Sequence, residues 1–270
     1  MTQHLPHVPP TEPGLTGVRN FRDVGGLPTT DGRVVRQGRL FRSGHLANAT
    51  AADAAALSAL GLHTIFDFRN AADLKLDGRD VELPGVRHVN IPLSDPAHGA
   101  EFWRMIRHGD LDQLRALLSD GKAAARMTES YRSVITDRTA EHSRVLHALA
   151  EDSVPALMHC AAGKDRAGVS VAVTLLAVGV EPGAVEADYL KSNAPAHRYL
   201  VRRSDTSPAG TSDEVMELLS PLFDARAEYL AAAFETIEQT WGTTERYLAE
   251  GLGLTPQTLE KLRGSLLDGA

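Results

Sequence analysis

The most constraining feature of this chain is a short loop between an apolar strand and an apolar helix. Residues 154–159 have the character of a buried strand, and residues 169–178 predict a helix that is apolar on every side. Between them lie the only cysteine of the protein, Cys160, and, six positions later, Arg166. A strand, a tight loop and a helix in this order indicate an α/β domain, with the loop at the carboxyl end of the strand.

The loop has the composition of an anion site with a nucleophile at its floor. Backbone N–H groups before a helix converge on one concavity, and the helix dipole favours an anion there. A thiol in that field loses its proton more readily, and the thiolate is the nucleophile. An arginine can hold two oxygens of a phosphoryl group, and a glycine lets the backbone approach the ligand closely. We therefore predict Cys160 as the nucleophile and, as phosphate-binding residues, Ala161, Ala162, Gly163, Lys164, Asp165 and Arg166.

The string from His159 to Arg166, HCxxGKDR, resembles the signature of the bacterial atypical tyrosine and phosphoinositide phosphatases. The resemblance covers most of the chain from about residue 15, and it is carried outside the loop by residues 20–23, 38–43, 67–69, 187–193 and 226–230. It implies a cysteine-phosphatase-like α/β fold, with a short, mostly parallel central sheet flanked by helices. It also implies hydrolysis of phosphotyrosine, phosphoserine, phosphothreonine and phosphoinositide substrates through a cysteinyl-phosphate intermediate, without a metal or another cofactor.

Departure of the leaving group requires a proton donor, and the sequence offers two. Asp95 follows a predicted strand, where many cysteine phosphatases carry an aspartate on a mobile loop. The alternative for Asp95 is an Asx turn before the next proline. Asp165 lies within the loop itself, and the resemblance to the family favours it as the general acid.

The residues beside the loop are expected to support it. His159 ends the strand, and we expect it to orient the loop and to help keep the cysteine ionised. Asp67 and Arg69 are expected to brace the loop rather than to touch substrate. Lys164 is either a solvated charge or a second cation at the mouth of the site, and we favour the second interpretation.

One position departs from the family. Thr or Ser usually follows the loop arginine and donates a hydrogen bond to the cysteine sulfur, whereas this chain has Ala167. The substitution predicts slow turnover, and it leaves open a phosphate-binding module with little turnover. A sulfur- or arsenate-handling enzyme is a third hypothesis, but such chemistry often needs further thiols, and the chain has none.

The rest of the sequence predicts one domain, residues 15–270, after a disordered segment at residues 1–14. The resemblance further predicts that helices within residues 194–241 form a lid. A net charge of −7 gives no support for nucleic-acid binding, and no apolar run reaches the length of a membrane span. The N-terminus is not a secretory signal, so we expect a cytoplasmic protein or one exported without a recognisable signal peptide. The oligomeric state does not follow from the sequence.

Local signals also predict individual elements of the first half. A turn at residues 30–32 indicates a hairpin, and residues 50–61 indicate a capped helix. Two strands are predicted at residues 62–68 and 86–91, and helical periodicity runs through residues 101–149.

Overall fold

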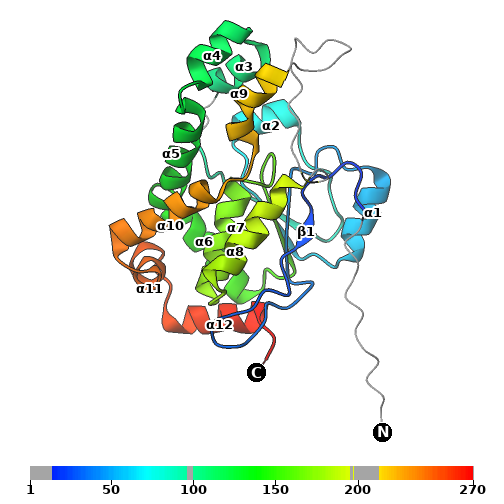
Figure 1. Cartoon of the computed structure of the whole chain (residues 1–270). Helices are drawn as coiled ribbons and strands as arrows, with labels where there is room; N and C mark the ends of the chain where they lie inside the picture. The colour runs from blue at the N-terminus through cyan, green and yellow to red at the C-terminus, as the bar shows by residue number, and fades with distance from the viewer. Residues whose placement is uncertain (1–13, 96–99, 195–196, 198–212, 270) are drawn as a thin grey trace.

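Short strands form one sheet in the middle of the molecule, in the order β1-β2-β5-β3-β4 (Figure 1). They are β1 (Arg22–Asp23), β2 (Leu40–Ser43), β3 (Thr64–Asp67), β4 (Arg87–Asn90) and β5 (Ala156–His159). β1 runs antiparallel to β2, and the other neighbouring strands run parallel. The prediction of an α/β fold with a short, mostly parallel sheet is therefore confirmed.

This computed structural model describes residues 14–95, 100–194, 197 and 213–269. Residues 1–13 of the predicted disordered segment lie outside the described residues, as do residues 198–212 of the predicted lid. Within the described ranges, every helix is too short or too polar to cross a lipid bilayer.

Alternation along the strands divides the interior into two cores. Successive side chains of a strand point to opposite faces of the sheet. In β5, Ala156 and Met158 belong to the larger core, whereas Leu157 belongs to the smaller one. β3 repeats the pattern with Phe66 in the larger core and Ile65 in the smaller. The central strand β5 is thus buried on both faces, which explains why its sequence is a continuous apolar run.

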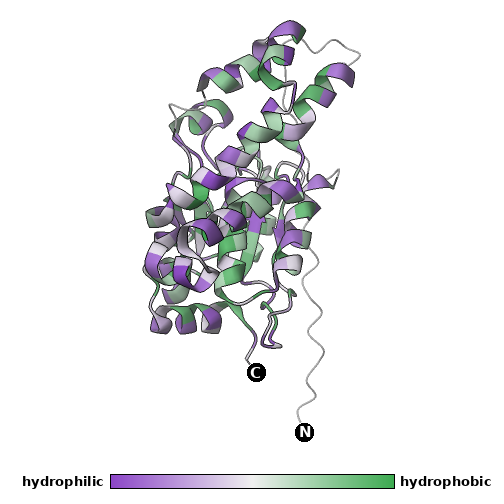
Figure 2. Cartoon of the chain, turned by 60° about the vertical axis from the view of Figure 1, so that its left-hand side comes forward, coloured by the Kyte–Doolittle hydropathy of each residue, from purple (hydrophilic) through white to green (hydrophobic). Residues whose placement is uncertain are grey.

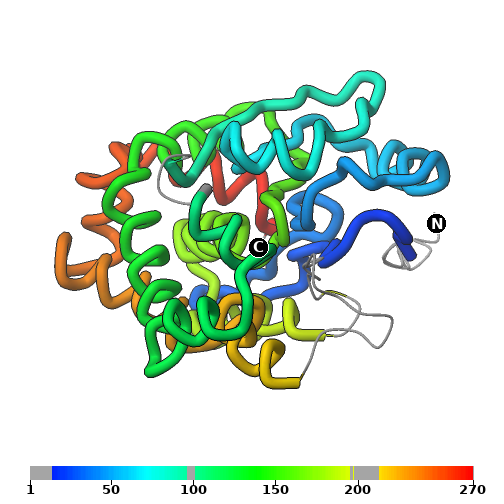
Figure 3. Tube along the Cα trace, turned by 90° about the horizontal axis from the view of Figure 1, so that it is seen from above, coloured from blue at the N-terminus to red at the C-terminus, as the bar shows by residue number. Residues whose placement is uncertain are grey.

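The helices cover the two faces unequally. The smaller core is closed by α1 (Ala51–Ala59), and the larger core is closed by helices that follow β4 in the chain. They include α5 (Lys122–Thr136), α6 (Thr139–Glu151), α7 (Arg166–Ala177), α8 (Pro182–Leu190), α10 (Ala227–Trp241) and α12 (Pro256–Leu266). The short α11 (Thr244–Arg246) has no buried residue, and the π-helical turn after it, Tyr247–Gly251, adds Tyr247 and Leu248 to this core. Seen from above, the N-terminal part of the chain lies on one side, and α5 and α10 lie together on the other (Figure 3). The outer helices mix hydrophobic with hydrophilic residues, as expected of elements with one buried face (Figure 2).

A group of helices forms one end of the molecule, at the top of Figure 1. It contains α3 (Ala100–His108), α4 (Leu111–Leu118) and α9 (Asp213–Phe223), and α9 packs on both α4 and α5. The buried side chains of α9 are Val215, Leu219 and Leu222, which lie on the stripe of apolar residues visible in the sequence. α10 packs along α5 and contributes several side chains to the larger core.

Most of the elements expected in the first half are confirmed. Thr50 caps α1 with the reciprocal hydrogen bonds of a capping box, and both predicted strands are present as β3 and β4. The predicted hairpin is confirmed by the antiparallel bridge between Pro28 and Val34. One helix was not expected from the sequence, namely α2 (Ala71–Asp77), which lies between β3 and β4.

Candidate active site

The cysteine loop, residues 160–165, joins β5 to α7. Cys160 is only 1% exposed, Asp165 occupies the N-cap position of α7, and Arg166 is the first residue of that helix. α7 is 12 residues long and enters the larger core. The predicted strand–loop–helix unit is therefore present, and it brings the thiol close to a helix N-terminus, where an anion is favoured.

The carbonyl groups of the loop are held from outside by residues distant in sequence. The His45 amide donates to the Ala161 carbonyl at 3.2 Å, and Asn20 Nδ2 donates to the Ala162 carbonyl at 3.1 Å. Arg42 Nη2 donates to the carbonyls of residues 163 and 164 at 2.9 and 3.3 Å. In a trans peptide the N–H points opposite to the C=O. The amides of residues 162–165 therefore point away from these anchors, and together they form a set of donors for a bound anion.

A buried ion cluster holds Arg42 in place. Asp188, on α8, accepts from Arg42 Nη1 at 2.8 Å and from Arg22 Nε at 2.9 Å, and all three side chains are at most 2% exposed. Burial alone would raise the pKa of Asp188, but the two guanidinium groups lower it below its usual value. The carboxylate is therefore ionised at neutral pH, and it ties α8 to the strands that carry the two arginines.

Arg166 is oriented by groups from two other segments. Its Nη1 forms an ion pair with Asp73 Oδ2 at 2.5 Å and donates to Ser94 Oγ at 3.1 Å. Burial tends to lower the pKa of Arg166, but the adjacent Cys160 and Asp73 raise it, so the guanidinium stays charged. Its Nε and Nη2 make no hydrogen bond with the residues that the structure describes. One edge of the guanidinium is therefore available for two oxygens of a phosphoryl group.

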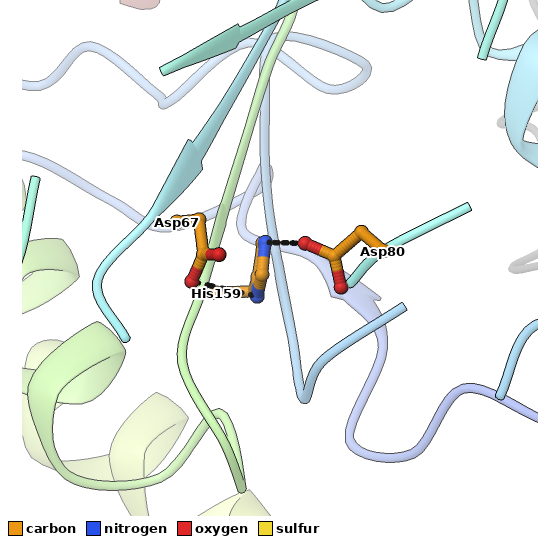
Figure 4. A group of neighbouring side chains, drawn as sticks. All are labelled: Asp67, Asp80 and His159. Atoms are coloured by element: carbon orange, nitrogen blue, oxygen red, sulfur yellow. Dashed lines mark ion pairs between the residues drawn. The ribbon is translucent and has the colours of Figure 1, made fainter. Parts of the chain in front are cut away.

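His159 joins a second ion network behind the loop (Figure 4). Its Nε2 lies 3.0 Å from Asp80 Oδ2, and its Nδ1 lies 3.8 Å from Asp67 Oδ1 and 3.5 Å from the Cys160 carbonyl. Arg69 Nη2 lies between the two carboxylates, at 3.0 Å from Asp67 and 2.9 Å from Asp80. Burial would raise the pKa of Asp80, but its close contact with His159 and the nearby charge of Arg69 lower it to about 2.

The same network has the composition of a possible metal site. Ligand atoms of Asp67, Asp80 and His159 all lie within 4.8 Å of one another. Arg69, however, already supplies the positive charge that these carboxylates require, and a metal ion beside it would be repelled. We interpret the network as structural: it fixes the carboxyl end of β5 immediately before the thiol.

Lys164 and Asp165 interact with each other at the helix entrance. Lys164 Nζ lies 2.5 Å from Asp165 Oδ1 and 3.2 Å from the Asp224 carbonyl, which follows α9. The lysine side chain is 5% exposed, whereas that of Asp165 is 27% exposed. The same Asp165 oxygen accepts from the hydroxyl of Tyr131 at 2.7 Å. Of this pair, the carboxylate is therefore the group that is open to the surface.

Two further positions were singled out in the sequence, namely Asp95 and Ala167. Asp95 is exposed, one residue after Ser94 and next to residues outside the described ranges. Ala167 is fully buried in the first turn of α7.

Several residues of the site were not identified from sequence. Asp73, Ser94 and Tyr131 belong to no segment that resembled the family, and Asp73 lies on the unexpected helix α2. Asn20, Arg42 and Asp188, which hold the loop, do lie in segments that resemble the family. That resemblance was the one signal in the sequence that could have identified them. Local patterns did not reveal their function, because Asn20 and Arg42 contact a loop more than a hundred residues away and Asp188 acts on it through Arg42.

Comparison with known proteins gives consistent matches. A sequence model described as the tyrosine phosphatase family matches residues 13–268. The chain is 34% identical over 278 aligned residues to the triple specificity protein phosphatase PtpB of Mycobacterium tuberculosis, covering 94% of this chain and 98% of that protein. It is 32% identical over 256 residues to a protein of Cupriavidus necator provisionally named a tyrosine-protein phosphatase, covering 93% of this chain and 87% of that protein. The cysteine loop and the residues that hold it lie within the matched region.

Proposed function

The chain belongs to the tyrosine phosphatase family, and we propose that Cys160 is the nucleophile with which it hydrolyses phosphomonoesters. In the first step the thiolate attacks phosphorus, the bond to the leaving oxygen breaks, and a cysteinyl phosphate forms. In the second step water attacks the same phosphorus, and the S–P bond breaks to return the thiolate and inorganic phosphate. The observation that supports this most directly is the loop itself, whose carbonyls are held from outside so that its amides are available above the thiol.

The loop amides and Arg166 stabilise the charge that develops during transfer. A transferring phosphoryl group spreads negative charge over three equatorial oxygens, and fixed donors around them lower the barrier. Arg166 is held by Asp73 and Ser94 through one nitrogen, which supports a fixed orientation of its remaining donors. Because these groups are already in place, little reorganisation accompanies the reaction.

Asp165 gives a proton to the leaving oxygen in the first step and accepts one from water in the second. Its partly exposed position beside Arg166 supports this role. Asp95 is the competing candidate. Exchanging each aspartate for asparagine separates the two, because loss of the acid slows substrates with basic leaving groups far more than aryl phosphates with good ones.

The substrates that we propose are phosphotyrosine, phosphoserine, phosphothreonine and phosphoinositides. The Mycobacterium tuberculosis relative is named a triple specificity protein phosphatase, which supports a broad choice of protein substrates. A second cation at the mouth of the site, as we expected Lys164 to be, would fit the head group of an inositol phosphate. Its ammonium contacts Asp165 and the Asp224 carbonyl, so it would have to leave these partners to meet a second phosphate.

Of the segment predicted to form a lid, residues 194–241, we expect α9 to be the part that covers the active site. The carbonyl of Asp224, just after this helix, accepts from Lys164 in the loop, and Arg115 on α4 pairs with Glu214 on α9. A lid that opens by moving α9 would break these contacts. Replacing Arg115 with Ala should then speed alkylation of Cys160, measured with iodoacetamide, whereas an unchanged rate would argue against opening at this contact.

The proposed activity is tested by phosphate release from phosphotyrosine and phosphothreonine peptides and from a soluble phosphoinositide. The native chain should turn over many times, and Cys160→Ser should not, because a serine hydroxyl stays protonated at neutral pH. The serine variant should keep its circular dichroism spectrum and still bind vanadate. Turnover by the serine variant would exclude the mechanism. Release of a single equivalent by the native chain would indicate the alternative function, a phosphate-binding module.

A further inference from the structure

Two buried tyrosines from different helices meet beside the cysteine loop. Tyr131 lies on α5 and Tyr189 on α8, and each is 1% exposed. Their hydroxyl oxygens are 2.7 Å apart, and their rings pack edge to face with centroids 6.1 Å apart. The Tyr131 hydroxyl also lies 2.7 Å from Asp165 Oδ1.

The chemistry of the three groups fixes the direction of these hydrogen bonds. An ionised carboxylate can only accept, so Tyr131 donates its single hydroxyl proton to Asp165. Tyr131 can then only accept from Tyr189, which uses its own proton for this bond. The result is a one-way chain of donors that ends on a single oxygen of Asp165.

Burial favours the protonated form of both tyrosines. Desolvation and the charge of Asp165 raise the pKa of Tyr131 well above its usual value, and desolvation likewise raises that of Tyr189. Both hydroxyls therefore stay protonated. The other ionisable groups that face the carboxylate are Lys164, Arg166 and Tyr229.

We propose that Tyr131 and Tyr189 are positioning residues for Asp165, forming a hydrogen-bond relay that fixes Oδ1 and leaves Oδ2 to exchange the proton with substrate. The proposal rests on the role of Asp165 as the general acid. Oδ1 already accepts from Tyr131 and from Lys164, whereas Oδ2 accepts no hydrogen bond from the described residues. Two hydrogen bonds to one carboxylate oxygen restrict rotation of the carboxylate about the Cβ–Cγ bond of Asp165. The proton therefore moves at one defined atom, in both the acid and the base step.

The test compares phenylalanine variants that each remove one hydroxyl. Tyr131→Phe should lower kcat/KM for phenyl phosphate by about 10-fold while leaving 4-nitrophenyl phosphate nearly unchanged, because only the poorer leaving group needs the acid. The basic limb of its pH profile should move to higher pH, since a carboxylate that loses a donor keeps its proton longer. Tyr247→Phe is the matched control: Tyr247 is buried, its hydroxyl contacts His142 at 3.5 Å, and it should change neither quantity.

The two tyrosines should not act independently. Tyr189→Phe removes a donor to Tyr131 only, so its effect should be in the same direction and smaller. The double variant should lose no more than Tyr131→Phe alone, because Tyr189 acts through Tyr131.

Comparison with Asp165→Asn distinguishes the possible failures. If the asparagine variant is selective for leaving group and Tyr131→Phe behaves like Tyr247→Phe, the relay is refuted and the proposed function stands. If Asp165→Asn shows no such selectivity, the assigned general acid is wrong and the relay is refuted with it. Additive losses in the double variant would also refute the relay, because they would show two separate actions.

Discussion

Gly163 is the position of the cysteine loop at which a single methyl group should have the largest effect. Its φ is +70°, a conformation that costs an alanine roughly 1–2 kcal/mol. A Cβ at this position would lie 2.3 Å from the carbonyl carbon and oxygen of Ser43 and 2.6 Å from the amide nitrogen of Gly44. These are backbone atoms at the end of β2, so they cannot swing aside as a side chain would.

The collision gives the size of the expected loss. Ordinary contact begins at 3.4 Å, so the loop must move away from β2 by about 1 Å to accept the methyl group. A misplacement of that size among reacting groups can lower the rate on the order of 100-fold. Gly163→Ala should therefore lose at least about 100-fold in kcat for 4-nitrophenyl phosphate, in addition to its loss of folding stability.

Gly38 provides a closely matched control for this prediction. Its φ is +71°, and no atom lies within 4 Å of an added Cβ, so Gly38→Ala has the same backbone cost without the collision. Both variants should lose roughly 1–2 kcal/mol in the free energy of unfolding measured in urea, and Gly163→Ala more. Only Gly163→Ala should lose activity. If both variants keep the native kcat, close contact with β2 does not position the loop.

Three further variants test other parts of the site and of the core. Asp73→Asn should lower kcat about 10-fold without weakening inhibition by inorganic phosphate, since it releases Arg166 but leaves its charge unneutralised; parallel loss of phosphate inhibition would contradict this. Ala167→Ser should raise kcat by up to about 10-fold and shrink the burst of 4-nitrophenol seen by rapid quench, because a hydroxyl can donate to the leaving thiolate; a native chain without a burst would refute it. His142 is fully buried, and desolvation lowers its pKa to about 4. As pH falls from about 6.5 toward 4, this histidine is protonated in the unfolded chain but not in the folded one, so the free energy of unfolding should decrease. His142→Gln should flatten that part of the curve of urea-unfolding free energy against pH, and an unchanged slope would assign it to other groups.

The central unit could be predicted because its signals are local. β5, the cysteine loop and α7 follow one another in sequence, and both flanking elements are apolar enough to be recognised. Helix α2 lacks such a signal, since none of its residues is buried and its apolar residues form no inward face. The sequence does contain a signal for the N-terminus of this helix, because Asn70 and Asp73 form a capping box. The helix matters because Asp73 also pairs with Arg166.

The contacts that hold the loop could not be predicted from local patterns. Arg42 lies 121 residues before the carbonyl that it binds at Gly163, and 146 residues before its partner Asp188. A sequence shows that a segment is rich in arginine, but not which arginine will be buried or which carboxylate will neutralise it. The contact of Tyr131 was likewise not predictable. Its position in the sequence indicates only one residue of the apolar face of a helix, whereas in the fold its hydroxyl donates to Asp165.

The pairing of charges around the loop explains how a chain with a net charge of −7 can form a phosphate site. Lys164 is neutralised by Asp165 and Arg166 by Asp73, whereas Arg42 shares the single carboxylate of Asp188 with Arg22 and contacts the loop only through its carbonyls. Direct contacts with phosphate therefore come from short-range donors, namely the loop amides, the start of α7 and the open edge of Arg166. Such donors act only at a defined geometry, which is why so many buried contacts serve to hold the loop. Buried ion pairs contribute little net stability but can enforce one arrangement, and the cluster at Asp188 fits that role because it fixes the carbonyls, and through them the amides, before any ligand arrives.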